Sequence, residues 1–285
     1  TLCLGLILYS IYCILFLCWE FLLVTTFASF TVPTGSMSPT ILPGESIYVN
    51  KWTIGGRIFN IFDAAKGKPV SISRLPGLRQ IEQNDILVFN YPYHLYDVRY
   101  DSIRLNMKTY FVKRCIGLPG SDIEIRKGRY MVNGKELEMT YDHNPQLESN
   151  LQYQEWLKER TVFRIDTTKH WTQKEFGPLH IPYRGEKIEL SESNIQMYRN
   201  LIEWEQHKRI KCLDGDIYLG DSLISSYHFL QDYYFMAGDN FYESEDSRFW
   251  GLVPADLIVG VASFIWKSKD PITRKMRWDR FLNGL

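Results

Sequence analysis

PTGSMSPT (residues 33–40) separates a long apolar segment from the strand-like segments that make up most of the chain. Gly35 gives the backbone freedom just before Ser36, and Pro39 stiffens the chain just after it. A serine on such a bend could be a nucleophile, although most serines beside glycine and proline are ordinary turn residues. Because a hydroxyl needs an activating base to become a useful nucleophile, the rest of the chain must be searched for that base.

Length and composition restrict the class of protein. The chain has 285 residues, enough for one or two domains with a hydrophobic core. Lys plus Arg equals Asp plus Glu at 33 each, so the bulk charge gives no reason to expect nucleic acid as a partner. Aromatic residues make up 15%, which suits a β-rich protein. The cysteines and the six scattered histidines show no metal-ligand spacing, and whether Cys115 pairs with Cys212 stays open.

The N-terminal segment is predicted to be a membrane anchor. Leu2–Val24 is almost continuously apolar, and Glu20 is the only charged residue before Glu45. As a helix this run would be about 35 Å long, enough to cross the hydrocarbon core of a bilayer. A buried core helix is the alternative, but soluble helices rarely run this long without charge. The number of spans upstream of Thr1 cannot be determined from this sequence.

Most of the remaining chain predicts strands. Asn133-Gly134 signals a tight hairpin, and residues 91–109 read as a long loop or a ragged hairpin. Two helices are predicted in the middle, over Leu147–Glu159 and Ser193–Gln206. The predicted strands are Phe27–Val32, Ser46–Val49, Asp85–Phe89, a run beginning at Tyr110, Asp122–Ile125, Tyr130–Leu137, Tyr233–Ala237 and Leu257–Trp266.

The predicted architecture is mainly β: an N-terminal transmembrane helix, then a β-rich core with an inserted α+β subdomain. The predicted divisions are an anchor over 1–25, a first part of the core over 26–128, an inserted variable subdomain over 129–230, a second part of the core over 231–270, and a basic and aromatic tail over 271–285.

Two further segments carry polar residues in unusual settings. Lys113 lies inside an apolar run, where a charged side chain is unfavourable unless it loses its charge or finds a partner. On its own it would be read as the solvated face of an edge strand. Asp246 and Arg248 are alternate residues that would share a face if extended, which alone predicts only a local ion pair.

Taken in order, four motifs resemble those of the bacterial type I signal peptidases, membrane-bound serine proteases that remove signal peptides from exported proteins. These motifs are PTGSMSPT at 33–40, NDILVFNYP at 84–92, FVKRCIGLPG at 111–120 and GDNFYESEDSRFWG at 238–251. Together they comprise 41 of the 285 residues. Asn84, where that family often has glycine, and the inserted Ser121 depart from the pattern, and both fall in predicted turns.

The resemblance implies a role for each matching residue. Ser36 would be the nucleophile and Lys113 the general base, whose pKa must fall by burial for it to accept a proton at neutral pH. Thr34 would complete the oxyanion hole, and Ser244 would orient the lysine by a hydrogen bond. The site would be supported by Asp239, Asn240, Asp246 and Arg248. The pockets for small side chains on either side of an Ala-x-Ala cleavage site would be walled by Phe30, Val32, Met37, Ile41, Phe111 and Val112.

The resemblance also implies partners and a location: signal peptides as substrates, the lipid bilayer as a partner, and the bacterial cytoplasmic membrane with the catalytic domain on its outer side. No cofactor, metal or nucleic acid is expected, and the oligomeric state is left open. Two alternatives remain. One is a membrane-tethered β-domain that binds signal peptides or partner subunits without cutting them. The other is a self-cleaving Ser/Lys repressor, which would need a DNA-binding helix-turn-helix where this chain has its apolar span.

Overall fold

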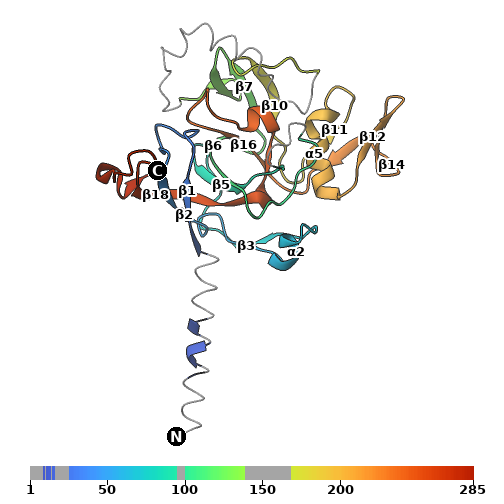
Figure 1. Cartoon of the computed structure of the whole chain (residues 1–285). Coiled ribbons are helices and arrows are strands. Elements are labelled where there is room, and N and C mark those ends of the chain that lie inside the picture. The colour runs from blue at the N-terminus through green and yellow to red at the C-terminus, as the bar shows by residue number, and fades with distance from the viewer. Residues whose placement is uncertain (1–8, 10, 14, 17–25, 95–99, 139–167) are drawn as a thin grey trace.

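The computed structural model describes residues 9, 11–13, 15–16, 26–94, 100–138 and 168–285, which form a mainly β fold (Figure 1). Its centre is an eight-stranded sheet. In spatial order its strands are β1 (Phe27–Val32), β2 (Glu45–Asn50), β18 (Ile258–Ser268), β5 (Ile86–Asn90), β6 (Tyr110–Gly117), β16 (Tyr233–Ala237) and β17 (Val253–Pro254), with β19 (Asn283–Gly284) paired to β18.

Smaller elements surround this sheet. One sheet contains β10 (Phe176–His180), β7 (Asp122–Arg126), β8 (Arg129–Val132) and β9 (Lys135–Glu136). The short pairings are β3 (Arg57–Ile58) with β4 (Ser73–Arg74), β11 (Lys187–Glu189) with β15 (Ser226–His228), and β13 (Asp216–Leu219) with both β12 (Ile210–Leu213) and β14 (Ser222–Leu223). The helices are α2 (Ile61–Ala65), α5 (Ile195–Gln206) and α6 (Ser247–Trp250), with 3-10 turns at η1 (Ala255–Leu257) and η2 (Trp278–Arg280).

The first hairpin places the Ser36 turn. β1 pairs antiparallel with β2 from Phe27↔Asn50 to Val32↔Glu45, so residues 33–44 form the connection at the far end of the hairpin. The Gly44 N–H donates to the Val32 carbonyl at 2.8 Å and closes this connection. Gly44 has φ +84°, a conformation that favours glycine. The turn that carries Ser36 is therefore fixed at both ends by the sheet.

Strand β6 lies between two hydrophobic clusters. Alternate side chains of a strand point to opposite faces of its sheet. Phe111 and Cys115 pack with the larger cluster, whereas Val112 packs with a smaller cluster that includes Val32 and Met37. Both faces of β6 are therefore covered by apolar side chains, and Lys113 lies on the same face as Phe111 and Cys115.

Several predictions from the sequence are confirmed. β1 and β16 have the predicted bounds, and α5 begins two residues after the predicted helix start and ends at Gln206 as predicted. Asn133 and Gly134 join β8 to β9 with φ values of 51° and 75°, as the hairpin signal requires. The predicted division between residues 128 and 129 falls in the turn of the β7–β8 hairpin, so the second sheet takes strands from both sides of it.

Other features were not predicted. β10 lies inside 169–183, where Gly177 and Pro178 hide the strand signal, and β12–β14 and α2 also had no prediction. The predicted helix Leu147–Glu159 lies outside the described residues, as does most of the predicted anchor over 1–25. Within the part of the chain that the structure describes, no helix is both long enough and apolar enough to span a membrane.

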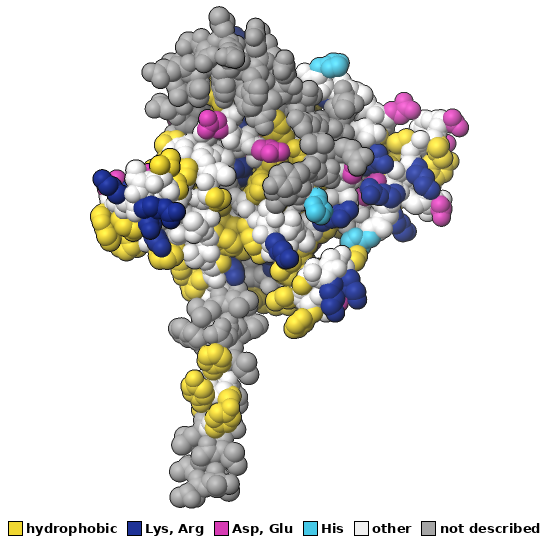
Figure 2. Space-filling view, viewed as in Figure 1, with side chains coloured by type: hydrophobic (Ala, Val, Ile, Leu, Met, Phe, Trp, Pro, Cys, Tyr) yellow, Lys and Arg dark blue, Asp and Glu magenta, His cyan; other side chains and the backbone are white. Residues whose placement is uncertain are grey.

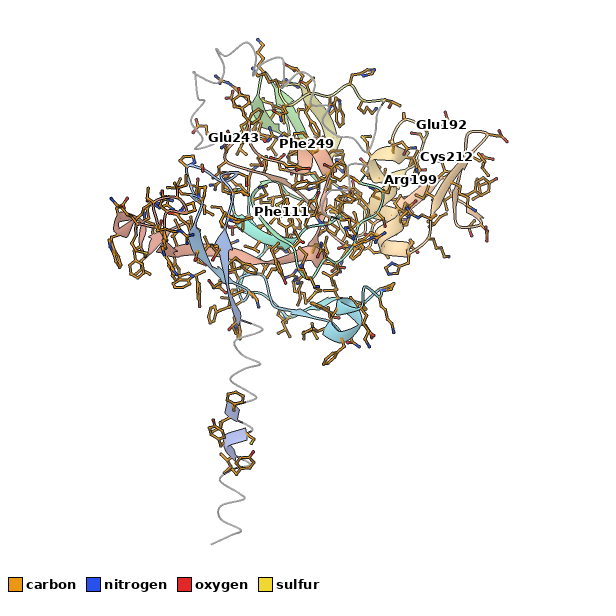
Figure 3. All side chains as sticks on the ribbon, viewed as in Figure 1. Phe111, Glu192, Arg199, Cys212, Glu243 and Phe249 are labelled. Atoms are coloured by element: carbon orange, nitrogen blue, oxygen red, sulfur yellow. The ribbon has the colours of Figure 1, made fainter. Side chains whose placement is uncertain are left out.

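The two cysteines whose pairing was left open are both free thiols. Cys115 is buried in β6, and Cys212 is exposed on β12. Figure 3 shows Cys212 at the outer side of the domain, close to Glu192 and Arg199, while Phe111 of β6 lies near the domain centre. The described residues therefore hold no disulfide between these positions.

Candidate active site

The structure brings Ser36 and Lys113 into direct contact. Lys113 Nζ lies 2.6 Å from Ser36 Oγ, although the two residues are 77 positions apart in the sequence. Ser36 comes from the β1–β2 connection, and Lys113 comes from the middle of β6. A neutral amine at this distance can accept the hydroxyl proton, so the pair has the geometry of a nucleophile and its base.

The surroundings of Lys113 favour its neutral form. Its side chain is 3% exposed, and Nζ lies 5.6 Å from the centroid of the Phe111 ring. Burial lowers the pKa of Lys113 from 10.5 to about 8. The positive charge of Arg248 acts in the same direction, whereas the carboxylate of Asp246 partly opposes the shift. At pH 7 about a tenth of Lys113 is therefore unprotonated, several hundred times the fraction expected at its ordinary pKa.

The turn that carries Ser36 is held by the loop that follows β16. The Asn240 N–H donates to the Ser36 carbonyl at 3.0 Å, and the Asn240 side chain donates to the Gly35 carbonyl at 3.2 Å. Asp239 accepts a hydrogen bond from Thr40 Oγ1 at 2.5 Å and two from Arg114, at 2.7 and 2.6 Å. Asp239 and Asn240 therefore connect the turn that carries Ser36 to both β16 and β6.

Asp246 and Arg248 form a completely buried ion pair under this loop. Arg248 donates from Nε and Nη2 to the two carboxylate oxygens of Asp246, both at 2.8 Å, and neither side chain is exposed. Burial alone would raise the pKa of Asp246, but Arg248 and the Gly238 N–H outweigh burial and hold this pKa below its ordinary value. Arg248 also donates to the Phe241 carbonyl at 2.7 Å and lies over the Phe241 ring. The pair fixes the loop from Gly238 to Trp250.

Ser244 differs from the expectation. Its hydroxyl is completely buried but forms no hydrogen bond of normal geometry, so the expected bond to Lys113 is not made. The hydroxyl lies instead on the side of Asp246, where it helps to lower the pKa of that carboxyl group. Ser244 thus borders the site without holding the lysine in this structure.

The other predicted residues gather around the same turn. Thr34 is exposed at its start. Met37 and Ile41 are completely buried, and Val32 and Val112 are nearly so, all in one cluster with partly buried Phe30 beside it. Phe111 packs in the other cluster, stacked on Tyr91 with ring centroids 4.4 Å apart. The predicted pocket residues thus lie on both faces of the sheet near Ser36, and their role in substrate binding stays a prediction.

Three polar residues that were not predicted from the sequence secure the far end of the turn. Arg280 donates to the Thr40 carbonyl at 2.7 Å and to both carboxylate oxygens of Glu45, and Arg277 donates to the Pro43 carbonyl at 2.6 Å. Glu45 is completely buried, and burial alone would raise its pKa, but Arg280, the Leu42 N–H and the Ser268 hydroxyl together lower it. The C-terminal tail, which was read only as basic and aromatic, therefore holds the turn that carries Ser36. Local sequence patterns carry no signal for contacts between residues this far apart.

Gly238 has a steric role. A methyl group at this position would lie 2.2 Å from Ser244 Oγ and 2.4 Å from the Ser36 carbonyl oxygen. Only glycine therefore lets the loop after β16 approach the turn that carries Ser36 this closely. The residue type at 238 limits where Ser36 can lie.

The fold and the site define a class of protein: a β-rich protein in which a buried lysine of lowered pKa contacts a serine hydroxyl, as in hydrolases that pair a serine with an amine base. The family described as signal peptidase, peptidase S26, matches residues 4–267, and the chain belongs to this family. By this membership it is a peptidase of the kind that removes signal peptides.

Similar proteins carry the same description. The chain is 28% identical over 247 residues to signal peptidase I of Buchnera aphidicola subsp. Schizaphis graminum, covering 84% of this chain and 67% of that protein. It is 26% identical over 253 residues to signal peptidase I of Aquifex aeolicus, covering 84% and 75%. A crystal structure of a signal peptidase I from Enterococcus faecalis V583 aligns with 66% of this chain and 100% of that chain, at 18% identity and a TM-score of 0.31.

Replacing Gly238 by alanine is expected to reduce peptide cleavage at least about a hundredfold, because moving a nucleophile by roughly 1 Å costs that much. The change should act mainly on kcat, measured with a soluble peptide. Gly284→Ala is the matched control, since no atom lies within 4 Å of the position that its methyl group would take. Cleavage by Gly238→Ala within a few-fold of wild type would show that the contact between the two loops does not set the position of Ser36.

Proposed function

We propose that this chain is a membrane-bound serine endopeptidase that removes N-terminal signal peptides from exported preproteins, with Ser36 as nucleophile and Lys113 as general base. The observation that carries the proposal is the 2.6 Å contact between Ser36 Oγ and a buried lysine amine of lowered pKa. Membership of the signal peptidase family gives the substrate class.

The proposed reaction has two halves. In the first, Ser36 Oγ attacks the carbonyl carbon of the scissile peptide bond while neutral Lys113 accepts the hydroxyl proton. The oxyanion would accept hydrogen bonds from the Ser36 N–H and the Thr34 hydroxyl. Lys113 then gives its proton to the leaving amine, and the C–N bond breaks to leave an acyl-enzyme. In the second half, Lys113 takes a proton from a water molecule that attacks the ester, and returns it to Ser36.

The proposed preference for small side chains at the P1 and P3 positions follows from the packing near Ser36. Met37 and Ile41 are already completely buried among Val32, Val112 and their neighbours, so the apolar residues near the serine form a packed wall. A larger substrate side chain would have to displace a packed wall, which is far more unfavourable than losing the contact of one methyl group.

The proposed membrane location rests on the apolar segment before β1. The large apolar side chains described in that segment are exposed, at 67% for Tyr9, 64% for Tyr12 and 63% for Leu15. Such residues are stable in contact with lipid and unfavourable in water. We place the anchor in a bacterial cytoplasmic membrane, with the catalytic domain on the outer side.

Ser36→Ala and Lys113→Ala should each abolish cleavage, with losses of roughly a thousandfold or more, and the double variant should be no worse than either single variant. Two residues that act as one unit give such non-additive losses. The measurement is peptide cleavage by purified protein, with Lys108→Ala, an exposed lysine on the adjoining loop, as control. Substantial activity in Lys113→Ala would exclude the lysine as base, and inactivity of the unaltered chain would favour the non-cutting binding domain.

Cleavage should rise with pH, because the lowered pKa of about 8 means that Lys113 gains its working, neutral form as pH passes through that value. At pH 6 the rate should be about one hundredth of its plateau. Glu245 raises the pKa of Lys113, so Glu245→Gln should move the rising limb to lower pH. A rate that is flat from pH 5 upward would point to a different base.

Removing the apolar segment should slow the cleavage of membrane-inserted preprotein without slowing the cleavage of soluble peptides. A variant that begins at Thr26 keeps β1 intact and should cut soluble peptides at the rate of the full chain. It should cut preprotein inserted in liposomes at least about tenfold more slowly, because anchoring raises the local enzyme concentration at the bilayer. Equal rates on the inserted preprotein at matched enzyme concentration would contradict the anchor.

A further inference from the structure

A cavity of about 730 Å³ lies away from Ser36, between α2, the loop before β6 and the end of α5. Most of its lining comes from three separate segments, residues 64–70, 102–109 and 203–209, and Tyr93 and His94 complete it. None of its lining residues belongs to the four motifs that define the active site. The cavity therefore has no part in the proposed peptidase reaction.

The rim of the cavity is strongly basic. Lys68, Arg104, Lys108 and Lys208 all line it and are all exposed, with one cation or more from each of the three segments. Among the described contacts, Arg104, Lys108 and Lys208 have no acidic partner, and Lys68 has only a long ion pair with Asp63 at 3.6 Å. Unpaired cations that converge from separate segments favour an anionic ligand.

The negative charge in the cavity wall is already neutralised. Glu203 lines the cavity, but it is bound by Arg209 at 2.7 Å and by Arg199 at 3.2 Å. Because Arg209 is paired with Glu203, it is not among the cations that are available to a ligand. The remaining cations face the cavity without a competing carboxylate in its lining.

The floor of the same cavity is apolar. Ala64, Ile103, Leu105 and Trp204 contribute to the lining, and Ile103 is almost completely buried. A free inorganic anion would leave this apolar surface uncovered. A ligand with an anionic head and an apolar body would satisfy both parts of the cavity.

The cavity adjoins an exposed apolar surface. Helix α2 contributes Ala64 to the cavity wall, and on the same helix Phe62 is 80% exposed and Ile61 is 52% exposed. Residues 52–78, which include α2 and are called the α2 segment below, begin with Trp52 and end with Leu78, and both of these side chains are also exposed. Figure 2 shows hydrophobic side chains gathered on the lower face of the domain around this segment, with Lys and Arg side chains beside them.

This surface is held rigidly at the end of the sheet where β1 begins. Arg74 donates to the carbonyls of Gly55, Ala255 and Ile258 at 2.7, 2.9 and 2.7 Å, and Arg57 donates to the Asp256 carbonyl at 2.9 Å. Phe27, the first residue of β1, pairs with Asn50, just before the segment begins. If the residues before Thr26 cross a bilayer, as proposed above, the α2 segment lies at the bilayer surface.

We propose that the cavity between α2, residues 102–109 and the end of α5 binds the phosphate headgroup of an anionic membrane lipid. The rim cations pair with the phosphate, the floor covers the glycerol and the first methylene groups, and Phe62 and Ile61 lie beside them at the interface. Basic residues next to apolar side chains are the usual means by which proteins bind anionic bilayer surfaces.

The test uses the full chain in a non-ionic detergent, so that it does not depend on the anchor or on cleavage. Native mass spectrometry should follow one-to-one binding of dihexanoyl phosphatidylglycerol, dihexanoyl phosphatidylcholine and inorganic phosphate. The variant is Arg104→Gln with Lys208→Gln. The control is Lys127→Gln with Lys135→Gln, which removes the same charge from two exposed lysines on the β7–β9 hairpins.

Phosphatidylglycerol should bind at least about tenfold more tightly than phosphatidylcholine, and the cavity variant should lose about tenfold or more of this affinity while the control changes less than twofold. Equal binding of the two lipids, or equal losses in variant and control, would overturn the proposal. Inorganic phosphate binding as tightly as phosphatidylglycerol would overturn the lipid assignment. Peptide cleavage is measured in the same samples as a separate readout. A loss of lipid binding with cleavage intact would bear on the cavity alone, whereas a loss of cleavage with lipid binding intact would bear on the proposed peptidase function.

Discussion

The proposed proton transfer across the contact between Ser36 Oγ and Lys113 Nζ requires a lysine that is buried without keeping its charge, and much of the surrounding structure favours that state. A carboxylate near the lysine would hold the proton on its amine. Asp246 and Asp239 both raise the pKa of Lys113, but each carboxylate is bound by an arginine, Arg248 and Arg114 respectively. Because these charges are paired, burial decides the pKa of Lys113. The two ion pairs therefore act on the base through its electrostatic surroundings, without contact with substrate.

The second constraint is the position of the serine. The turn over residues 33–44 has a few backbone hydrogen bonds of its own, such as Ser38 to Gly35 and Ile41 to Met37. It is also held by segments far away in the sequence. Asn240 holds its start, Asp239 binds Thr40, and Arg280 and Arg277 hold the carbonyls of Thr40 and Pro43. A turn held from several directions keeps its hydroxyl in one place before the substrate arrives, and such preorganisation is where most of the catalytic advantage of an active site comes from.

These two constraints explain which features could be predicted from the sequence. Strands such as β16, an unbroken apolar run next to a turn, follow from local pattern, and the Asn133-Gly134 hairpin follows from turn chemistry. The meeting of Ser36 and Lys113 was expected only through the resemblance of four motifs, because alternation alone placed Lys113 on a solvated face. β10 was missed because Gly177 and Pro178 interrupt its pattern. The clamp by Arg280 and Glu45 depends on a side-chain pairing across most of the chain, which no local pattern encodes.

If the residues before Thr26 cross a bilayer, as proposed above, the first hairpin also relates the site to that bilayer. Phe27 and the α2 segment mark one end of β1, and the turn with Ser36 marks the other, so the strand separates them by six residues, or about 20 Å. β1 is the first strand in the order of the sheet, and in the part of the chain that the structure describes it pairs with β2 alone. An extended peptide that leaves the bilayer beside the anchor could run along this edge by strand addition, with main-chain hydrogen bonds setting its register. The length of β1 would then determine how far beyond the membrane the peptide is cut.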